Sequence, residues 1–197
     1  MRRNILALLV VSFLLALAGA VVSPAPCPAA GRDRALERTL GDGYAADEAG
    51  QIGRAFRAAV QGGVRERTAS GLVESCVEGE FSAEQIVRVL SLAAQLALED
   101  LPVDSFADKL EEGTAKGVPA ERVLQAAEAR ALTLNQAKGA VNAAVLDGLE
   151  VRDRGELIGD VAGALEGGQD VAEVGRILRL ARDEGWSQRN IRRALFP

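Results

Sequence analysis

Histidine is absent from all 197 residues of the chain. Imidazole is the usual general acid or base near neutral pH and a common ligand of zinc and copper. Its absence therefore excludes His-dependent acid/base catalysis, catalytic triads that contain His, and His-ligated zinc or copper sites. No motif in the sequence narrows the function as much as this one absence.

Aromatic residues are also scarce, at 4% of a chain that is 48% hydrophobic. Small residues make up much of the remainder, so we predict closely approaching helices around a thin core. Segments that alternate apolar and polar residues with Val, Ile and Thr enrichment are lacking as well. No strands are therefore predicted, and the fold class is all-α.

Residues 44–197 predict a single all-helical domain of about eight to ten helices, because apolar residues recur at helical spacing between Gly- and Pro-containing breaks. The clearest helix start is residues 81–86, where Ser82 and Gln85 form a capping box and Phe81 packs on Ile86. Another start is predicted at Thr133, after a helix that ends near Ala131.

Successive helix starts are about 14 to 20 residues apart, so that a helix pair occupies about 35 residues. This spacing is typical of an α-solenoid-like array of antiparallel helical hairpins. An irregular helical bundle has the same capping chemistry in its loops and is the alternative. The packing between helix pairs distinguishes the two.

The N-terminus has the pattern of a targeting segment. Arg2 and Arg3 precede an apolar run, and Ala18-Gly19-Ala20 supplies a small-residue cleavage site. We predict a signal peptide over residues 1–20 and a periplasmic or secreted protein. The alternative is an uncleaved inner-membrane anchor over residues 5–22. Residues 21–43 predict a Pro/Ala-rich tether with a short helix.

Cleavage at this site leaves 21 basic and 28 acidic residues, a net charge of −7. Nucleic acids and anionic membranes attract proteins of the opposite sign, so neither is expected as a partner, apart from the membrane through an uncleaved anchor. Cys27 and Cys76 are candidates for one disulfide in an oxidising compartment. Two unpaired thiols or an intermolecular bridge are the alternatives.

The segment Glu111-Glu112-Gly113-Thr114-Ala115-Lys116-Gly117-Val118-Pro119 resembles a turn of secreted, all-helical bacterial proteins of uncharacterised function. Their turn has the pattern E-G-x-A-K-G-V/I-P. The resemblance covers about residues 60–195 and rests on this motif and the helical pattern. It implies an extracytoplasmic helical domain and brings no catalytic residues with it.

No catalytic, metal or cofactor site is predicted. Glu111 and Glu112 are adjacent, but neighbours on a helix point about 100° apart and cannot converge on one substrate. The Gly-Gly steps lack the lysine and preceding strand of a phosphate loop, and calcium-loop spacing is missing. Neither Ser70 nor Cys76 has a histidine to activate it.

The C-terminal region has a different charge balance. Residues 170–197 carry six arginines against four acids, whereas residues 21–169 carry 15 basic and 24 acidic residues. Arginine and tryptophan are frequent anchors of interfaces. The candidate docking residues are Arg176, Arg179, Arg182, Trp186, Arg189 and Arg192. Alternatively, the arginines neutralise the acidic body of the same molecule and Trp186 packs on Ile191.

These observations predict an exported helical protein that acts as a binding or structural module of the cell envelope for a protein or peptide partner. An extracytoplasmic hydrolase that uses carboxylates alone is one alternative. Such an enzyme requires a pocket holding two acids from different helices. A holdase-like envelope chaperone is the other, and it requires a sizeable exposed apolar concavity.

Overall fold

The computed structural model describes residues 36–41 and 43–196, and this part of the chain contains nine helices and no strand. The prediction of an all-α fold with about eight to ten helices is confirmed. Residues 36–40 are helical and precede α2 (Ala46–Gln61), α3 (Glu66–Glu78), α4 (Ala83–Leu98), α5 (Val103–Ala115), α6 (Ala120–Leu146), α7 (Arg154–Glu166), α8 (Val171–Asp183) and α9 (Gln188–Leu195).

The predicted signal peptide (1–20), the alternative anchor (5–22) and most of the predicted tether (21–43) lie outside the described residues. None of the helices in the described ranges is long and apolar enough to cross a membrane.

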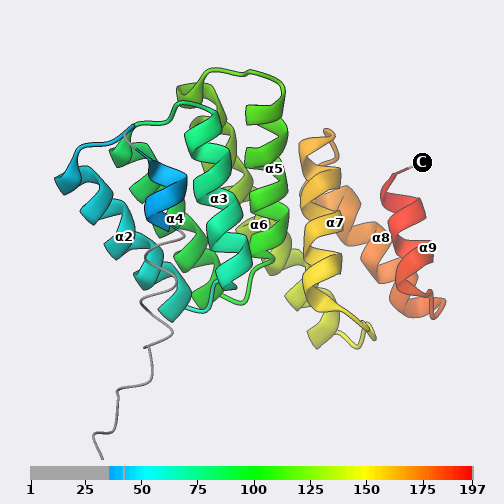
Figure 1. The fold of residues 1–197 in the computed structure, drawn as a ribbon. Coiled ribbons are helices and arrows are strands. Elements are labelled where there is room, and N and C mark those ends of the chain that lie inside the picture. Colours follow the sequence, from blue (N-terminus) through cyan, green and yellow to red (C-terminus); the bar gives the residue numbers. More distant parts are fainter. Residues whose placement is uncertain (1–35, 42, 197) are drawn as a thin grey trace, which may run out of the picture.

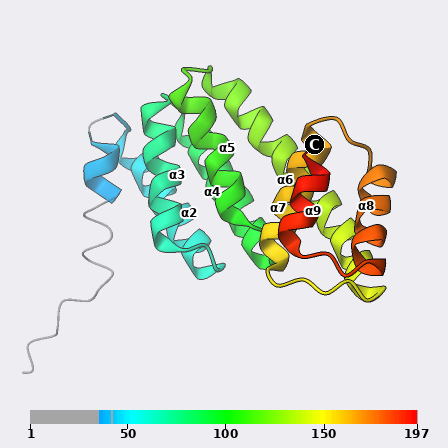
Figure 2. The same cartoon turned by 90° about the vertical axis from the view of Figure 1, so that its right-hand side faces the viewer.

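The helices form a row of two layers, with α3, α5 and α7 in front of α4, α6 and α8 (Figure 1). Extensive packing among the described helices joins only those that are one or two places apart along the chain, such as α2 with α4 and α7 with α9. Figure 2 views the row from its C-terminal end, where α8 and α9 lie side by side. This arrangement favours the array of stacked hairpins over the irregular bundle.

The predicted capping chemistry starts and ends several of these helices. At α4, the Gln85 amide donates to Ser82 Oγ at 3.3 Å and the Ser82 amide donates to Gln85 Oε1 at 2.9 Å. Phe81 and Ile86 are both buried, as the predicted staple requires. After α5, Gly117 has a φ of +65°, a left-handed conformation that glycine adopts without steric strain.

The prediction of a break near Ala131 and a new helix at Thr133 is wrong, because α6 runs uninterrupted for 27 residues. Thr133 lies in the helix interior, where its hydroxyl donates to the Ala129 carbonyl at 3.0 Å. Leu132, expected to pack at a helix start, is 69% exposed. Residues 120–138 contain neither Gly nor Pro, so nothing in this stretch stops a helix once it has formed.

Glycine allows α5 and α6 to approach closely at the centre of the row. Val123 of α6 is buried, and a Cβ atom placed on Gly113 of α5 would lie 3.0 Å from both of its methyl carbons. Any larger residue at Gly113 would therefore crowd a stiff β-branched side chain. This contact is one instance of the close helix approach that the composition predicts.

A buried arginine of α6 connects this helix to α5 and α7. Arg130, at the middle of α6, is 7% exposed. Its Nη2 donates to Ser105 Oγ of α5 and, at 3.4 Å, to the Gly159 carbonyl of α7. Its Nη1 lies 3.1 Å from Glu166 Oε2, also on α7, in an ion pair. Because α6 packs extensively on both α5 and α7, this side chain lies where the two halves of the row meet.

Candidate binding site

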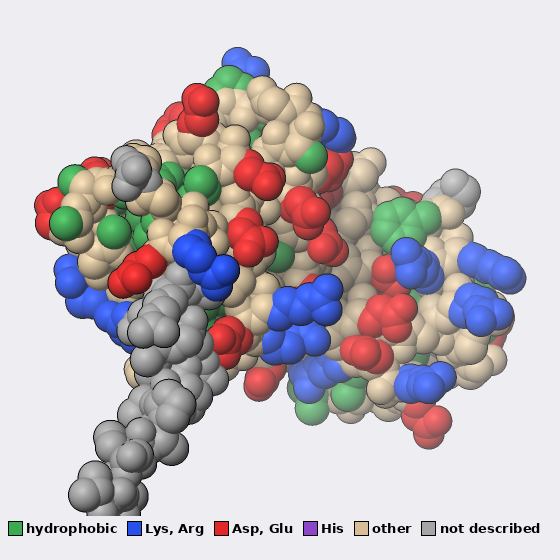
Figure 3. Space-filling view, viewed as in Figure 1, with side chains coloured by type: hydrophobic (Ala, Val, Ile, Leu, Met, Phe, Trp, Pro, Cys, Tyr) green, Lys and Arg blue, Asp and Glu red, His purple; other side chains and the backbone are tan. Residues whose placement is uncertain are grey.

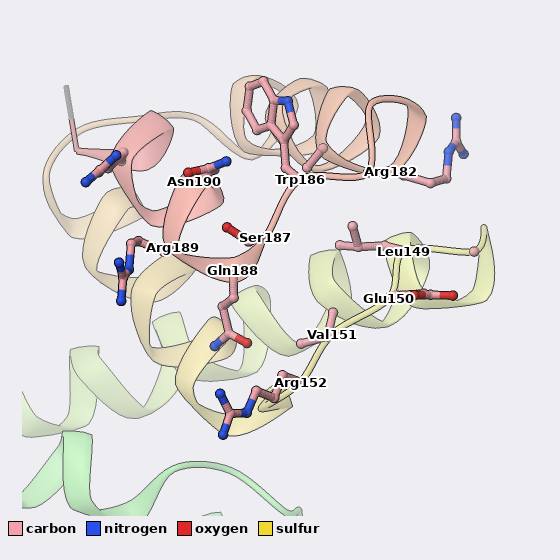
Figure 4. A pocket seen from close by; sticks show the side chains of 14 residues that line it. Leu149, Glu150, Val151, Arg152, Arg182, Trp186, Ser187, Gln188, Arg189 and Asn190 are labelled. Carbon is pink, nitrogen blue, oxygen red and sulfur yellow. The ribbon is translucent and has the colours of Figure 1, made fainter.

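An open groove of about 1090 Å³ lies at the C-terminal end of the row, and we call it the C-terminal groove. One wall is the loop between α6 and α7, and the other is the turn between α8 and α9 with the start of α9 (Figure 4). The groove is lined by residues of these two walls and of the end of α8. They include Leu149, Glu150, Val151, Arg152, Ala181, Arg182, Trp186, Ser187, Gln188, Arg189, Asn190 and Arg193.

Backbone turns and one glutamine fix the two walls. Leu149 donates its amide to the Ala144 carbonyl at 2.9 Å, and Trp186 donates to the Ala181 carbonyl at 2.8 Å, so each wall begins at a closed helix end. Gln188 then joins the walls. Its Oε1 accepts from the Asp153 amide at 3.1 Å, and its Nε2 donates to the Asp153 carbonyl at 3.0 Å.

The lining is strongly basic for a chain whose net charge is −5. It holds Arg152, Arg182, Arg189 and Arg193 against a single acid, Glu150. Arg182 is paired with Asp183 at 2.7 Å and lies 3.9 Å from Asp147. The other three arginines form no ion pair with any other residue in the described part of the chain. Figure 3 shows Lys and Arg side chains gathered at this end of the molecule.

The start of α9 adds to the positive potential. Ser187 is the N-cap residue, but its side chain accepts no capping hydrogen bond from the helix. The first amides of a helix carry partial positive charge, and the N-cap side chain normally accepts a hydrogen bond from one of them. Here Ser187, Gln188 and Arg189 all line the C-terminal groove, so the uncapped start of α9 opens into it.

The structure divides the predicted docking residues. Arg182, Trp186 and Arg189 line the C-terminal groove, whereas Arg176 and Arg179 are exposed on α8 outside its lining. Trp186 packs partly buried against the core, and its indole Nε1 donates to Glu184 Oε2 at 2.8 Å. The packing of Trp186 against the core agrees with a structural role, and its role as a docking anchor stays a prediction.

Arg192 lies on the side of α9 that faces α7. It is 3.5 Å from Asp160 Oδ1 and 3.9 Å from Glu156 Oε1. Burial raises the pKa of Asp160, while Arg192 lowers it and Glu156 raises it further. Arg192 therefore neutralises acids of its own chain, as the alternative interpretation of the basic region has it.

Sequence reasoning missed Arg152, Gln188 and Arg193 as residues of this site. Arg193 is four residues after Arg189, so helical periodicity could have grouped these two on one face of the last helix. Arg152 has no such signal. It comes to the groove only because α7 packs on α9.

The acids considered for catalysis do not converge. Glu112 is exposed near the end of α5, and hydrogen bonds from Lys116 and Lys109 lower its pKa, whereas a general acid needs a raised one. Asp104, Asp108 and Glu111 line a smaller groove of about 440 Å³, but all three belong to α5. Within the described residues, no group of three or more Cys, Asp or Glu side chains could hold a metal ion.

In the described part of the chain, exposed large apolar side chains are spread over three helices and the residue after α9, whereas a holdase requires an apolar concavity. They are Leu98, Leu132, Leu146, Val171, Leu180 and Phe196. Leu132 borders a groove of only about 250 Å³ between α4 and α6.

Cys76 is fully buried on α3 with a free thiol, and burial raises its pKa to about 12. Its predicted partner Cys27 lies outside the described residues, so the disulfide stays a prediction. A thiol without contact to water or to a base is a packing residue and a poor nucleophile.

The buried thiol predicts that the reduced protein loses stability at alkaline pH. Between about pH 9, the ordinary pKa of the thiol, and about pH 12, the folded chain keeps a proton that the unfolded chain has released. The free energy of unfolding therefore falls as the pH rises through this window. Urea unfolding at pH 8 and pH 10 measures the fall. A Cys76→Ala variant should show a smaller one, and an equal fall in both proteins would contradict the prediction.

Comparison of the chain with protein-family models, with curated proteins and with solved structures finds no match.

Proposed function

We propose that this protein is an exported binding module of the cell envelope, and that its C-terminal groove binds an acidic segment of a protein or peptide partner. The observation that carries the proposal is the clustering of four arginines against one glutamate in the lining of this groove. Three of these arginines form no ion pair within the described residues, so their charges are open to a partner.

The charge of the rest of the molecule supports an acidic partner. With a net charge of −5, the chain as a whole repels an acidic segment, whereas the groove attracts it. Such a contrast orients the encounter and disfavours contact elsewhere on the surface. Trp186 adds a large, rigid side chain of the kind that anchors interfaces.

The proposed location rests on the N-terminal pattern, with its basic residues, apolar run and small-residue cleavage site. The resemblance to secreted bacterial helical proteins agrees with it. An uncleaved anchor over residues 5–22 would place the same groove at the outer face of the inner membrane.

A pair of matched charge reversals tests the proposed function. We expect the double variant Arg189→Glu with Arg193→Glu to bind an oligoglutamate peptide at least about tenfold more weakly than the wild type. The double variant Arg176→Glu with Arg179→Glu changes the net charge equally on exposed positions outside the groove, and should bind almost normally. Titration at low and at physiological salt measures both affinities.

Equal weakening in both double variants would mean that net charge alone governs binding, and would reject the groove as the site. Circular dichroism of each variant checks that the helices are intact. Both pairs lie on exposed positions, so the fold should tolerate them.

A further inference from the structure

The C-terminal groove has an apolar middle between basic ends. Leu149 and Val151 lie near the centre of the close-up and Trp186 at its top, with Arg182 to one side and Arg152 and Arg189 to the other (Figure 4). Val151 and Trp186 are only partly buried, so they offer apolar surface to a ligand. A ligand that carries only charged groups would leave this apolar surface exposed to water.

The size and backbone of the groove favour an extended ligand. At about 1090 Å³ it has room for several residues of a peptide. In the described chain, the amides of Glu150, Val151 and Arg152 make no backbone hydrogen bond. An extended peptide has free backbone carbonyl groups that can accept hydrogen bonds from such amides. The backbone groups of a helical ligand are already hydrogen-bonded within the helix.

We infer, on the basis of the proposed function, that the C-terminal groove selects an extended segment with the pattern acid–x–apolar–x–acid. In an extended chain, side chains at positions i, i+2 and i+4 point to the same face, and they span about 13 Å. The pattern therefore directs one apolar side chain to Val151, and one carboxylate to the arginines on either side.

The single tryptophan of the chain provides the readout. Because Trp186 lines the groove, its fluorescence should shift when a ligand covers it. We would titrate the purified protein with the peptides GDSLSDG, GDSSSDG and GKSLSKG, whose ends are blocked. The first has the full pattern, the second has the acids alone, and the third has the apolar residue between lysines.

We expect GDSLSDG to bind at least about fivefold more tightly than GDSSSDG, since burying part of a leucine side chain is worth about 1 kcal/mol or more. GKSLSKG should not bind. A Val151→Ser variant should lose much of the preference for leucine while it still binds GDSSSDG. Arg176→Glu, outside the groove, should retain both affinities and the preference.

Each outcome is decisive. Equal affinity for GDSLSDG and GDSSSDG would overturn the inferred pattern and leave the proposed function intact. If neither acidic peptide nor oligoglutamate bound, both would be rejected. Inorganic polyphosphate that bound as tightly as GDSLSDG would overturn the assignment of a peptide, because a polyanion has nothing to place on Val151.

Discussion

Replacing Glu166 with glutamine is expected to destabilise the protein by about 2 kcal/mol, more than replacing its partner Arg130 with methionine. The first change leaves the charge of a guanidinium that is 7% exposed without its carboxylate. The second removes that charge and keeps an unbranched apolar side chain in the same space, so it should cost about 1 kcal/mol or less.

The hydrogen bonding of Arg130 explains why methionine should be tolerated. Its Nε is buried without a hydrogen-bond partner among the described residues, and its Nη1 meets Glu166 at 3.1 Å without hydrogen-bond geometry. Unsatisfied buried donors are costly, so the wild-type arginine already carries a desolvation penalty that methionine lacks.

Urea unfolding of the two single variants and of the double variant measures these effects. Because the double variant has neither charge, it should recover most of the stability that Glu166→Gln loses. Glu166 is about one-third exposed, which is why the expected loss is below that of a fully buried pair. A Glu166→Gln protein as stable as the wild type would show that solvent replaces the carboxylate.

A larger loss, about 4 kcal/mol or more, is expected for Val123→Asp. Val123 is buried between α5 and α6 against Gly113, where a carboxylate would be removed from water. A loss of this size is a large part of the total stability of an ordinary domain, so the central helix pair should unfold.

Val118→Asp is the matched control for this prediction. Val118 and Val123 are both apolar and lie on either side of the start of α6, but Val118 is only partly buried in the turn before the helix. Its replacement should cost about 1 kcal/mol. Thermal unfolding followed by circular dichroism compares the two. Equal losses, or a wild-type melting temperature for Val123→Asp, would contradict the packing described here.

Local signals in the sequence were sufficient for most helix boundaries. The capping box at Ser82 and the glycine exit at Gly117 act within a few residues, so they can be read without knowledge of the tertiary structure. The same reasoning failed at Thr133, since a Thr-x-x-Gln pattern occurs inside helices too. An uninterrupted run of helix formers outweighed it.

Features that depend on packing between distant helices could not be predicted. Arg130 falls on the apolar stripe of α6, between Ala127 and Leu134, so helical periodicity could have marked it as buried. Its partners on α5 and α7 have no signal in the sequence. The C-terminal groove was foreseen in part, through Arg182, Trp186 and Arg189. Its opposite wall comes from a loop about 35 residues earlier, which only the contact of α7 with α9 brings near.

The uninterrupted α6 has a mechanical consequence for the whole row. At 27 residues it is a rod about 40 Å long, and it packs on α4, α5, α7 and α8. In arrays of short helices, each unit contacts only its neighbours and can unravel separately. Here α6 belongs to two consecutive helix pairs, so unfolding of one pair would destabilise the other. The described helices should therefore unfold in one cooperative step, and stiffness at the groove depends on helices at the far end of the molecule.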